Sequence, residues 1–197
     1  MTDPVDWNEK WRERAAEALI PDPWLERVLP LLPPGRVLDL ACGRGRNALH
    51  LAALGWRVTA VDASDEGLAL LDQEARRRGL AMELRQQDLE TQPQLPVAQF
   101  ELVLDFFYLQ RSLFAPLKAA LVPGGVAVVR TFSAAGGFAG GPRRQEFILQ
   151  PGELLERFGG WEILLHEEGR EAARQGGGLA GIVARRPPEA PETAPCA

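Results

Sequence analysis

The sequence predicts an α/β fold in which one Rossmann-like, doubly wound sheet of seven strands, mostly parallel with the last strand antiparallel, carries helices on both faces. From residue 36 onward, strand-like and helix-like segments alternate, which is typical of a parallel sheet with crossover helices. The first strand breaks at a Gly-x-Gly turn, Gly43 to Gly45, and continues directly into a helix. The 197 residues suffice for one such domain, which we expect to span residues 1–185.

Each element follows from local signals. Residues 7–29 place tryptophan, leucine and valine among charges, which predicts one or two amphipathic helices interrupted at Pro21 and Pro23. Ser64 is a preferred N-cap residue and Gly79 a preferred helix terminator, so they bound a helix. In the core of residues 36–185, the predicted strands lie near 36–41, 56–61, 81–86, 100–106 and 125–131, and the predicted helices lie near 46–54, 65–78 and 111–121.

The C-terminal third departs from this alternation. Residues 133–142 are rich in glycine and predict a mobile loop without regular structure, and residues 151–158 predict a short helix. The strands predicted at 161–167 and 178–185 follow each other without a crossover helix, so we expect an antiparallel hairpin at one sheet edge. The proline-rich residues 186–197 predict a disordered tail.

Composition limits the class of protein and its partners. The chain is 46% hydrophobic and 25% charged, and no apolar run approaches the ~20 residues that cross a bilayer, so we expect no membrane segment. The acidic N-terminal residues do not form a secretory signal, which favours the cytoplasm. A net charge of −5 argues against nucleic acid as a partner. Two cysteines make neither a disulfide framework nor a metal site. We expect a monomer or weak homodimer.

The glycine turn indicates a nucleoside cofactor. A dinucleotide site requires a third glycine where this chain has Ala48. Asp39 lies inside the first strand, where a carboxylate suits a cationic ligand. The second strand ends in Asp62, seventeen residues beyond Gly45, and an acid at a strand end can accept both ribose hydroxyls. These features disfavour a nicotinamide-dependent oxidoreductase.

At these residues the sequence resembles the class I S-adenosylmethionine-dependent methyltransferases, whose acid-x-Gly-x-Gly-x-Gly motif stands here as Asp39-Leu40-Ala41-Cys42-Gly43-Arg44-Gly45. The resemblance implies S-adenosyl-L-methionine as cofactor and S-adenosyl-L-homocysteine as product, without a metal. It implies that Asp62 binds the ribose and that Asp88 and Leu89 bind adenine, although an Asp after a strand is also a common turn former. The cofactor-binding residues predicted in this way are Asp39, Ala41, Gly43, Gly45, Asn47, Asp62, Ala63, Asp88, Leu89, Asp105, Trp7 and Trp11.

Nearly the whole chain also resembles the bacterial methyltransferases of the tellurite-resistance type. The matching segments are Trp7-Asn8-Glu9-Lys10-Trp11, Cys42-Gly43-Arg44-Gly45-Arg46-Asn47, Tyr108-Leu109-Gln110-Arg111, Pro123-Gly124-Gly125, Thr131-Phe132 and Pro151-Gly152-Glu153-Leu154. This resemblance implies a small cytoplasmic enzyme in which residues 1–30 form a helical lid over the cofactor. The acceptor that it implies is a small molecule with a soft nucleophile, such as a thiol or a chalcogen oxyanion.

The catalytic candidates are Arg46, Tyr108 and Arg111. The Arg46 guanidinium suits an anionic acceptor or the methionine carboxylate, and a plain surface charge is the alternative. The stretch Asp105-Phe106-Phe107-Tyr108 keeps the acid and the aromatic residue of amino-group methyltransferases but lacks both of their prolines, so N-methylation stays open as an alternative. A non-catalytic, cofactor-binding regulatory subunit is the other alternative.

Overall fold

The computed structural model describes residues 6–91, 93–174 and 176–189, and within them it contains one seven-stranded sheet with the order β3-β2-β1-β4-β5-β7-β6. The strands are β1 (Arg36–Leu40), β2 (Arg57–Asp62), β3 (Glu83–Gln86), β4 (Phe100–Phe106), β5 (Leu121–Ser133), β6 (Glu162–Ala172) and β7 (Gly178–Arg185). The first five strands run parallel, and β7 pairs antiparallel with both β5 and β6. The predicted sheet and its antiparallel edge hairpin are therefore confirmed.

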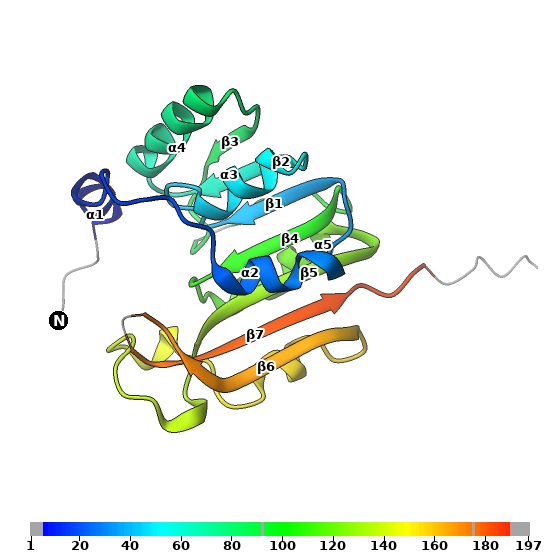
Figure 1. Ribbon diagram of the computed structural model, residues 1–197. Coiled ribbons are helices and arrows are strands. Elements are labelled where there is room, and N and C mark those ends of the chain that lie inside the picture. Colours follow the sequence, from blue (N-terminus) through cyan, green and yellow to red (C-terminus); the bar gives the residue numbers. More distant parts are fainter. Residues whose placement is uncertain (1–5, 92, 175, 190–197) are drawn as a thin grey trace, which may run out of the picture.

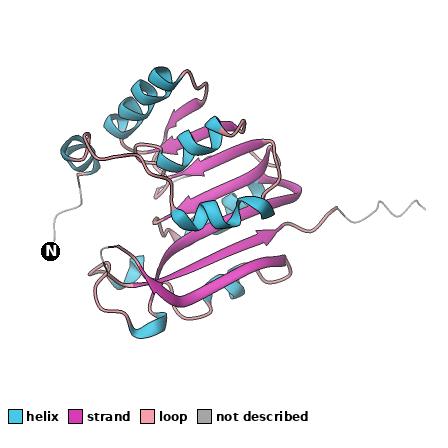
Figure 2. Ribbon diagram, in the orientation of Figure 1, coloured by secondary structure: helices cyan, strands magenta, loops and turns pink. Residues whose placement is uncertain are grey.

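Helices cover both faces of this sheet (Figure 1 and Figure 2). One apolar core unites the sheet with α2 (Pro23–Val28), α3 (Arg46–Ala53) and α4 (Asp65–Arg78), and the other unites it with α5 (Phe114–Ala120) and α6 (Glu153–Arg157). Short 3-10 turns lie at η1 (Leu29–Leu31), η2 (Arg111–Leu113), η3 (Ala135–Gly137) and η4 (Gln145–Phe147), and α1 (Trp7–Glu13) lies near the N-terminus and contacts α4.

Two predicted elements differ in detail. The helix expected at 111–121 begins as a 3-10 turn and becomes α-helical only at Phe114, because Pro116 has no N–H to donate to the preceding turn. The segment 133–142 contains η3 and is fastened to the turn between β6 and β7, where the Gly177 N–H donates to the Ala139 carbonyl at 2.8 Å. The tail expected from residue 186 begins with a paired residue, since the Arg186 N–H donates to the Gly125 carbonyl. Residues 190–197 lie outside the described part.

The parallel strands end at one edge of the sheet, which is the left edge in Figure 1. The turn after β1, helix α1 and the segment between β5 and α6 all lie along this edge. In an open α/β sheet, ligands bind outside the carboxyl ends of the strands, so this edge is where a site is expected. None of the described helices is long and apolar enough to cross a membrane.

Candidate active site

The turn between β1 and α3 is wound left-handed at three positions. Ala41, Gly43 and Gly45 have φ values of 51°, 55° and 72°. The Gly45 N–H donates to the Cys42 carbonyl at 2.9 Å and closes the turn, and the Leu49 N–H donates to the Gly45 carbonyl as α3 begins. Glycine adopts this backbone without the strain that a side chain would add, so the turn can bring its N–H groups close to a ligand at the N-terminus of α3.

Asp62, the last residue of β2, accepts a hydrogen bond from this turn. Its Oδ2 accepts the Gly43 N–H at 2.7 Å, and its Oδ1 accepts the Ser64 N–H at 2.8 Å. Burial raises the pKa of Asp62, and the N–H groups of Ser64, Gly43 and Ala63 oppose that rise. Each carboxylate oxygen has a further lone pair, so the group can still accept bonds from two ligand hydroxyls.

Two further acids are buried at this edge. Asp39 is 3% exposed, and burial raises its pKa to about 7, against the lowering effect of the Arg46 charge and of the Ala48 N–H. Asp105 lies near the end of β4, and burial raises its pKa well above the ordinary value, with a further contribution from Asp39. Among the described residues, Asp105 Oδ1 has no hydrogen-bond partner. A positively charged ligand next to these carboxyl groups would favour their ionised form.

Helix α1 packs directly on the glycine turn. The Trp7 and Trp11 rings are stacked with centroids 5.8 Å apart, and a Cβ built on Gly43 would lie 2.6 Å from the Trp11 ring. Asn8 fixes the helix to the start of α4, because its amide donates to Asp65 and accepts from the Ser64 hydroxyl. The predicted position of both tryptophans at the cofactor turn thus agrees with the packing of α1.

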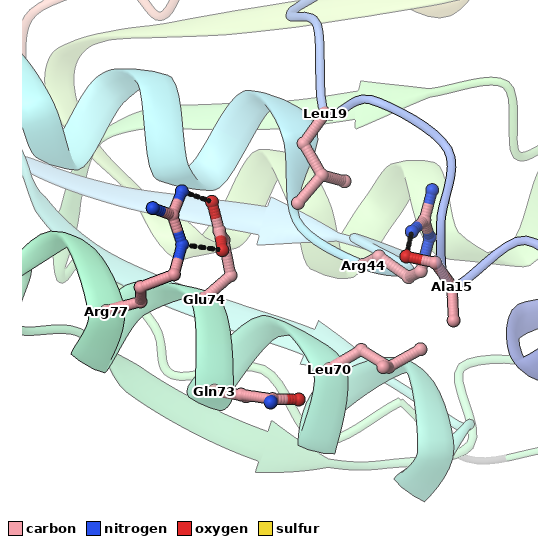
Figure 3. A pocket seen from close by; sticks show the side chains of 7 residues that line it. All are labelled: Ala15, Leu19, Arg44, Leu70, Gln73, Glu74 and Arg77. Carbon is pink, nitrogen blue, oxygen red and sulfur yellow. Dashed lines mark hydrogen bonds and ion pairs between the residues drawn. The ribbon is translucent and has the colours of Figure 1, made fainter.

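Arg44, inside the turn, points away from the ligand side. Its two Nη atoms donate to the carbonyls of Ala15 and Glu17 and hold the segment that follows α1 (Figure 3). A cavity of about 230 Å³ lies between this segment and α4, and there Arg77 is already paired with Glu74 at 2.7 Å. The side chain of Arg44 therefore couples the turn to the N-terminal segment.

Asp88 follows β3, where the family resemblance places the adenine contact. Its two oxygens accept the Glu90 N–H at 2.8 Å and the Thr91 hydroxyl at 2.9 Å, and these bonds lower its pKa. The carboxylate thus caps its own turn, and neighbouring Leu89 is buried at 4% exposure. In this structure the Asp88 side chain therefore acts as a turn former, which was the alternative to an adenine contact.

Tyr108 lies on the cofactor side of the site. Its hydroxyl is buried without a hydrogen-bond partner among the described residues. Burial raises its pKa, and so do the charges of four acids at the ends of β2, β3 and β4, namely Glu90, Asp105, Asp88 and Asp62. The hydroxyl therefore lies among the acids that surround the cofactor turn.

Arg46 and Asn47, the first two residues of α3, bind a segment that the sequence did not single out. The Asn47 amide oxygen accepts the Asp22 N–H at 3.0 Å, and Arg46 Nη2 lies 3.1 Å from Asp22 Oδ2. Asp22, 4% exposed, also lies 3.6 Å from Arg130 Nε, and Arg130 pairs with Glu171 at 2.5 Å. The Asp22 carboxylate thus lies between Arg46 of α3 and Arg130 of β5. Two features of the sequence could have indicated this contact. Asp22 precedes a proline, which is a helix-start signal, and Arg130 is a charged residue inside an apolar strand.

Phe107 turns the chain at the end of β4 with a φ of 61°, which is uncommon for a bulky residue. Its N–H donates to the Arg130 carbonyl at 2.7 Å. Its ring lies 5.3 Å from the Arg46 guanidinium and 5.7 Å, edge to face, from the Phe132 ring. Strained backbone of this kind is frequent at functional sites.

Arg111 is engaged in holding the chain together. Its guanidinium binds the Glu153 carboxylate with two hydrogen bonds of 2.8 and 2.9 Å, and it donates to the carbonyls of Glu146 and Ile148. Burial is the largest single influence and raises the pKa of Glu153, but the hydrogen bonds and charge of Arg111, with hydrogen bonds from the Gln150 N–H and Arg157, together outweigh it and hold that pKa at about 2. Arg111 therefore anchors the segment between β5 and α6.

Comparisons with known proteins indicate the class. Residues 37–125 match the family described as a methyltransferase domain. Together with the 3-2-1-4-5-7-6 sheet, the glycine turn and its acids, this match makes the chain similar to the S-adenosylmethionine-dependent methyltransferases.

Among these methyltransferases, the chain is similar to TehB of Haemophilus influenzae, named as a probable S-adenosyl-L-methionine-dependent methyltransferase. The two are 26% identical over 149 residues, which cover 70% of this chain and 50% of TehB. The crystal structure of TehB shares the fold, with a TM-score of 0.75 at 21% identity over 91% of this chain and 67% of that chain. A malonyl-[acyl-carrier protein] O-methyltransferase of Enterobacter lignolyticus is 35% identical over 62% of this chain and 47% of its own length. The chain spans about half the length of these curated relatives.

The residues at the edge of the sheet fit S-adenosylmethionine. The partnerless Asp105 oxygen and the Tyr108 hydroxyl can bond to a ligand amine or hydroxyl, and buried polar atoms without partners are rare in native proteins. The buried carboxyl groups of Asp39 and Asp105 suit the positive charges of the ligand's sulfonium and ammonium groups. Asp62 retains acceptor capacity for the ribose beside Gly43 of the turn.

Proposed function

We propose that the protein transfers the methyl group of S-adenosylmethionine to a small-molecule acceptor with a soft nucleophilic atom, such as a thiol sulfur or a chalcogen oxyanion. The observation that carries the proposal is the left-handed turn clasped by Asp62 beside the buried carboxyl group of Asp39. The similarity to TehB supports S-adenosyl-L-methionine as the methyl donor. A cytoplasmic location stays a prediction and forms part of the proposal.

When bound, S-adenosylmethionine supplies a methyl group attached to a positively charged sulfur. A lone pair of the acceptor would form the new bond to the methyl carbon while the carbon–sulfur bond breaks, and the electrons of the broken bond would stay on the sulfur. The protein's contribution is alignment and the exclusion of water. In this proposal Asp39 faces the cationic part of the ligand, Asp62 accepts the ribose hydroxyls, and Trp11 covers the turn from the solvent side. Asn47 holds the start of α3 through Asp22.

The acceptor side favours a nucleophile that needs no strong general base. The chain has two histidines. His50, in α3, lies 3.0 Å from the Glu26 carboxylate. His166 is opposite Ile182 in the β6–β7 hairpin, away from the ends of the parallel strands. The side chains near Phe107 are an arginine and aromatic rings. An oxyanion is already ionised and a thiol loses its proton far more readily than an alcohol, so an amine or alcohol gains more from a base.

The remaining site assignments belong to the same proposal. On the cofactor side they are Ala41, Gly43, Gly45, Ala63, Asp88, Leu89, Asp105 and Trp7, and on the acceptor side they are Tyr108 as a catalytic candidate, Arg46 as an anion-binding group and Arg111 as the anchor of the neighbouring segment. Replacing Asp88 with Asn tests its assignment, because loss of an adenine contact weakens cofactor binding whereas loss of a turn contact alone does not.

Two measurements test the function. Calorimetry should show micromolar binding of S-adenosylhomocysteine and no binding of NAD, and the reverse result would overturn the class of cofactor. Incubation with labelled S-adenosylmethionine and a panel of thiols, selenite, tellurite, amines and nucleobases should then label a thiol or a chalcogen. Labelling of amines instead would favour the Asp105 to Tyr108 alternative, and binding without any transfer would favour a regulatory subunit.

Asp62→Ala provides the sharpest test of the cofactor site. Loss of the charged hydrogen bonds should weaken S-adenosylhomocysteine binding by about 1–3 kcal/mol, or about 5- to 150-fold. Ser64→Ala is a matched control, since it removes the α4 cap and the Asn8 bond next door but leaves the carboxylate. An unchanged affinity in Asp62→Ala removes this residue from the site.

A further inference from the structure

A second cavity lies at the same edge of the sheet, beyond β5. It has a volume of about 140 Å³, and its walls include Phe132, Phe138, Gln145, Ile148 and Gly178. A cavity of about 150 Å³ lined by apolar side chains holds one benzene-sized ring. The size of this cavity therefore suits a single ring or an aliphatic group of similar volume.

The walls of this cavity are built from closely packed backbone. The Gly177 N–H donates to the Ala139 carbonyl at 2.8 Å, and Gly140 forms a bridge with Gly176. A Cβ built on Gly177 would lie 2.8 Å from Gly141 Cα. Glycine at these positions lets two loops touch, so the cavity is shaped by fixed contacts between the segment after β5 and the β6–β7 turn.

Phe132 connects the cavity to the end of β4. Its ring meets the Phe107 ring edge to face, and the other neighbour of Phe107 is the Arg46 guanidinium. The Phe107 and Phe132 rings thus lie in series from the Arg46 cation to the cavity, whose walls also include the polar residues Ser133 and Gln145. Offset and edge-to-face contacts of this kind also accept a planar ligand ring.

Arg46 retains donors for a ligand. Its side chain is 40% exposed, and the hydrogen bond found for it within the described residues runs from Nη2 to Asp22. Nε and Nη1 are free to bind a carboxylate or another oxyanion. The residue opens α3 directly after Gly45, so the cation stands between the cofactor turn and Phe107.

From this arrangement we infer that the methyl acceptor is an anionic small molecule with a single ring or a group of similar size. Its anionic group binds Arg46, its body lies against Phe107 and Phe132, and its other end fills the 140 Å³ cavity. The inference rests on the proposed function and adds to it the substrate class and the residues that select it.

Three thiols test the inference with labelled S-adenosylmethionine. They are 2-mercaptobenzoate, with a ring and a carboxylate, thiophenol, with the ring alone, and mercaptoacetate, with the carboxylate alone. We expect kcat/KM for 2-mercaptobenzoate to exceed that for either partial analogue at least tenfold. Equal values for 2-mercaptobenzoate and mercaptoacetate would overturn the role of the cavity.

Two variants test separately the contribution of the cavity and that of the Arg46 cation. Ala134→Leu places a larger side chain at the cavity wall and should abolish the advantage of 2-mercaptobenzoate over mercaptoacetate. Arg46→Gln should abolish its advantage over thiophenol. Arg57→Gln, an exposed arginine at the opposite end of β2, is the matched control and should change neither ratio. A change in all three thiols by the same factor would contradict the inference.

A binding measurement covers the case in which no thiol is methylated. Calorimetry with 2-(methylthio)benzoate in the presence of saturating S-adenosylhomocysteine should show binding that weakens at least tenfold in Ala134→Leu and in Arg46→Gln. Absence of binding to the unsubstituted protein overturns the inference. Failure of S-adenosylhomocysteine itself to bind overturns the proposed function instead, so the two failures are distinguishable.

Discussion

Cofactor affinity should depend on pH through Asp39. This carboxyl group is 3% exposed, and its burial raises its pKa to about 7, with the charge of Arg46 lowering it and that of Asp62 raising it. A bound ligand with sulfonium and ammonium charges favours the ionised carboxylate, so binding below pH 7 must release a proton. Affinity should therefore rise with pH.

The size of the effect follows from the pKa. A carboxyl group with a pKa of about 7 is ionised in about one molecule in ten at pH 6 and in about nine in ten at pH 8. Affinity for S-adenosylmethionine should rise about tenfold over this range, which is about 1.4 kcal/mol, and should then level off. Stability of the free protein follows the opposite sign. The folded pKa is above the unfolded one, so the contribution of Asp39 is greatest below pH 4 and declines as pH rises to 7.

The assay is calorimetry at pH 6, 7 and 8 in buffers of different ionisation enthalpy, which counts the protons released on binding. The ligand's own amino group titrates equally with every variant, so the informative quantity is the difference between proteins. Asp39→Asn should release nearly one proton fewer at pH 6. An equal proton count in Asp39→Asn and the unsubstituted protein would refute the reasoning.

Three predictions concern stability, each measured as the free energy of unfolding in urea. Asp22→Asn should cost about 3 kcal/mol, because it leaves buried Arg130 with Glu171 alone; a cost below about 1 kcal/mol would show that Asp22 does not compensate that charge. Gly45→Ala should cost about 1–3 kcal/mol, since φ is 72° and the new Cβ would collide with Leu71; Gly79→Ala, also left-handed but with open space around it, should cost less. Arg111→Ala should cost about 2 kcal/mol through loss of the Glu153 pair and two carbonyl contacts. An unchanged free energy of unfolding would show that Arg111 does not anchor this segment.

The cofactor half of the site was predictable because its signals are local. Asp39, the Gly-x-Gly turn and Asp62 each stand at a strand end that the residues beside them define. The antiparallel hairpin was predictable for a similar reason, since no helix separates its two strands. Periodicity and turn residues act over short stretches of chain, and these features need nothing more.

The acceptor half depends on contacts between distant residues, which local patterns do not contain. Asp22 meets Arg130 across more than a hundred positions, and Arg111 meets Glu153 across 42. Arg111 stands in a strand-end segment that the sequence associates with catalysis, yet its guanidinium is used to fasten the segment between β5 and α6. The sequence identifies charged side chains near the site but does not say which of them are already paired.

Phe107 links the two halves. A left-handed residue at the end of β4 sends its own ring toward Arg46 and Phe132, while the next residue, Tyr108, places its hydroxyl among the acids of the cofactor side. Glycine would make this turn with less strain, and strained non-glycine residues persist where surrounding contacts hold them in place. Here those contacts are the Arg46 guanidinium and the Phe132 ring, and Phe132 lines the 140 Å³ cavity. The ring of Phe107 also packs against the apolar core that includes α2 and α3, so its strained backbone joins that core to the cation that we propose for acceptor binding.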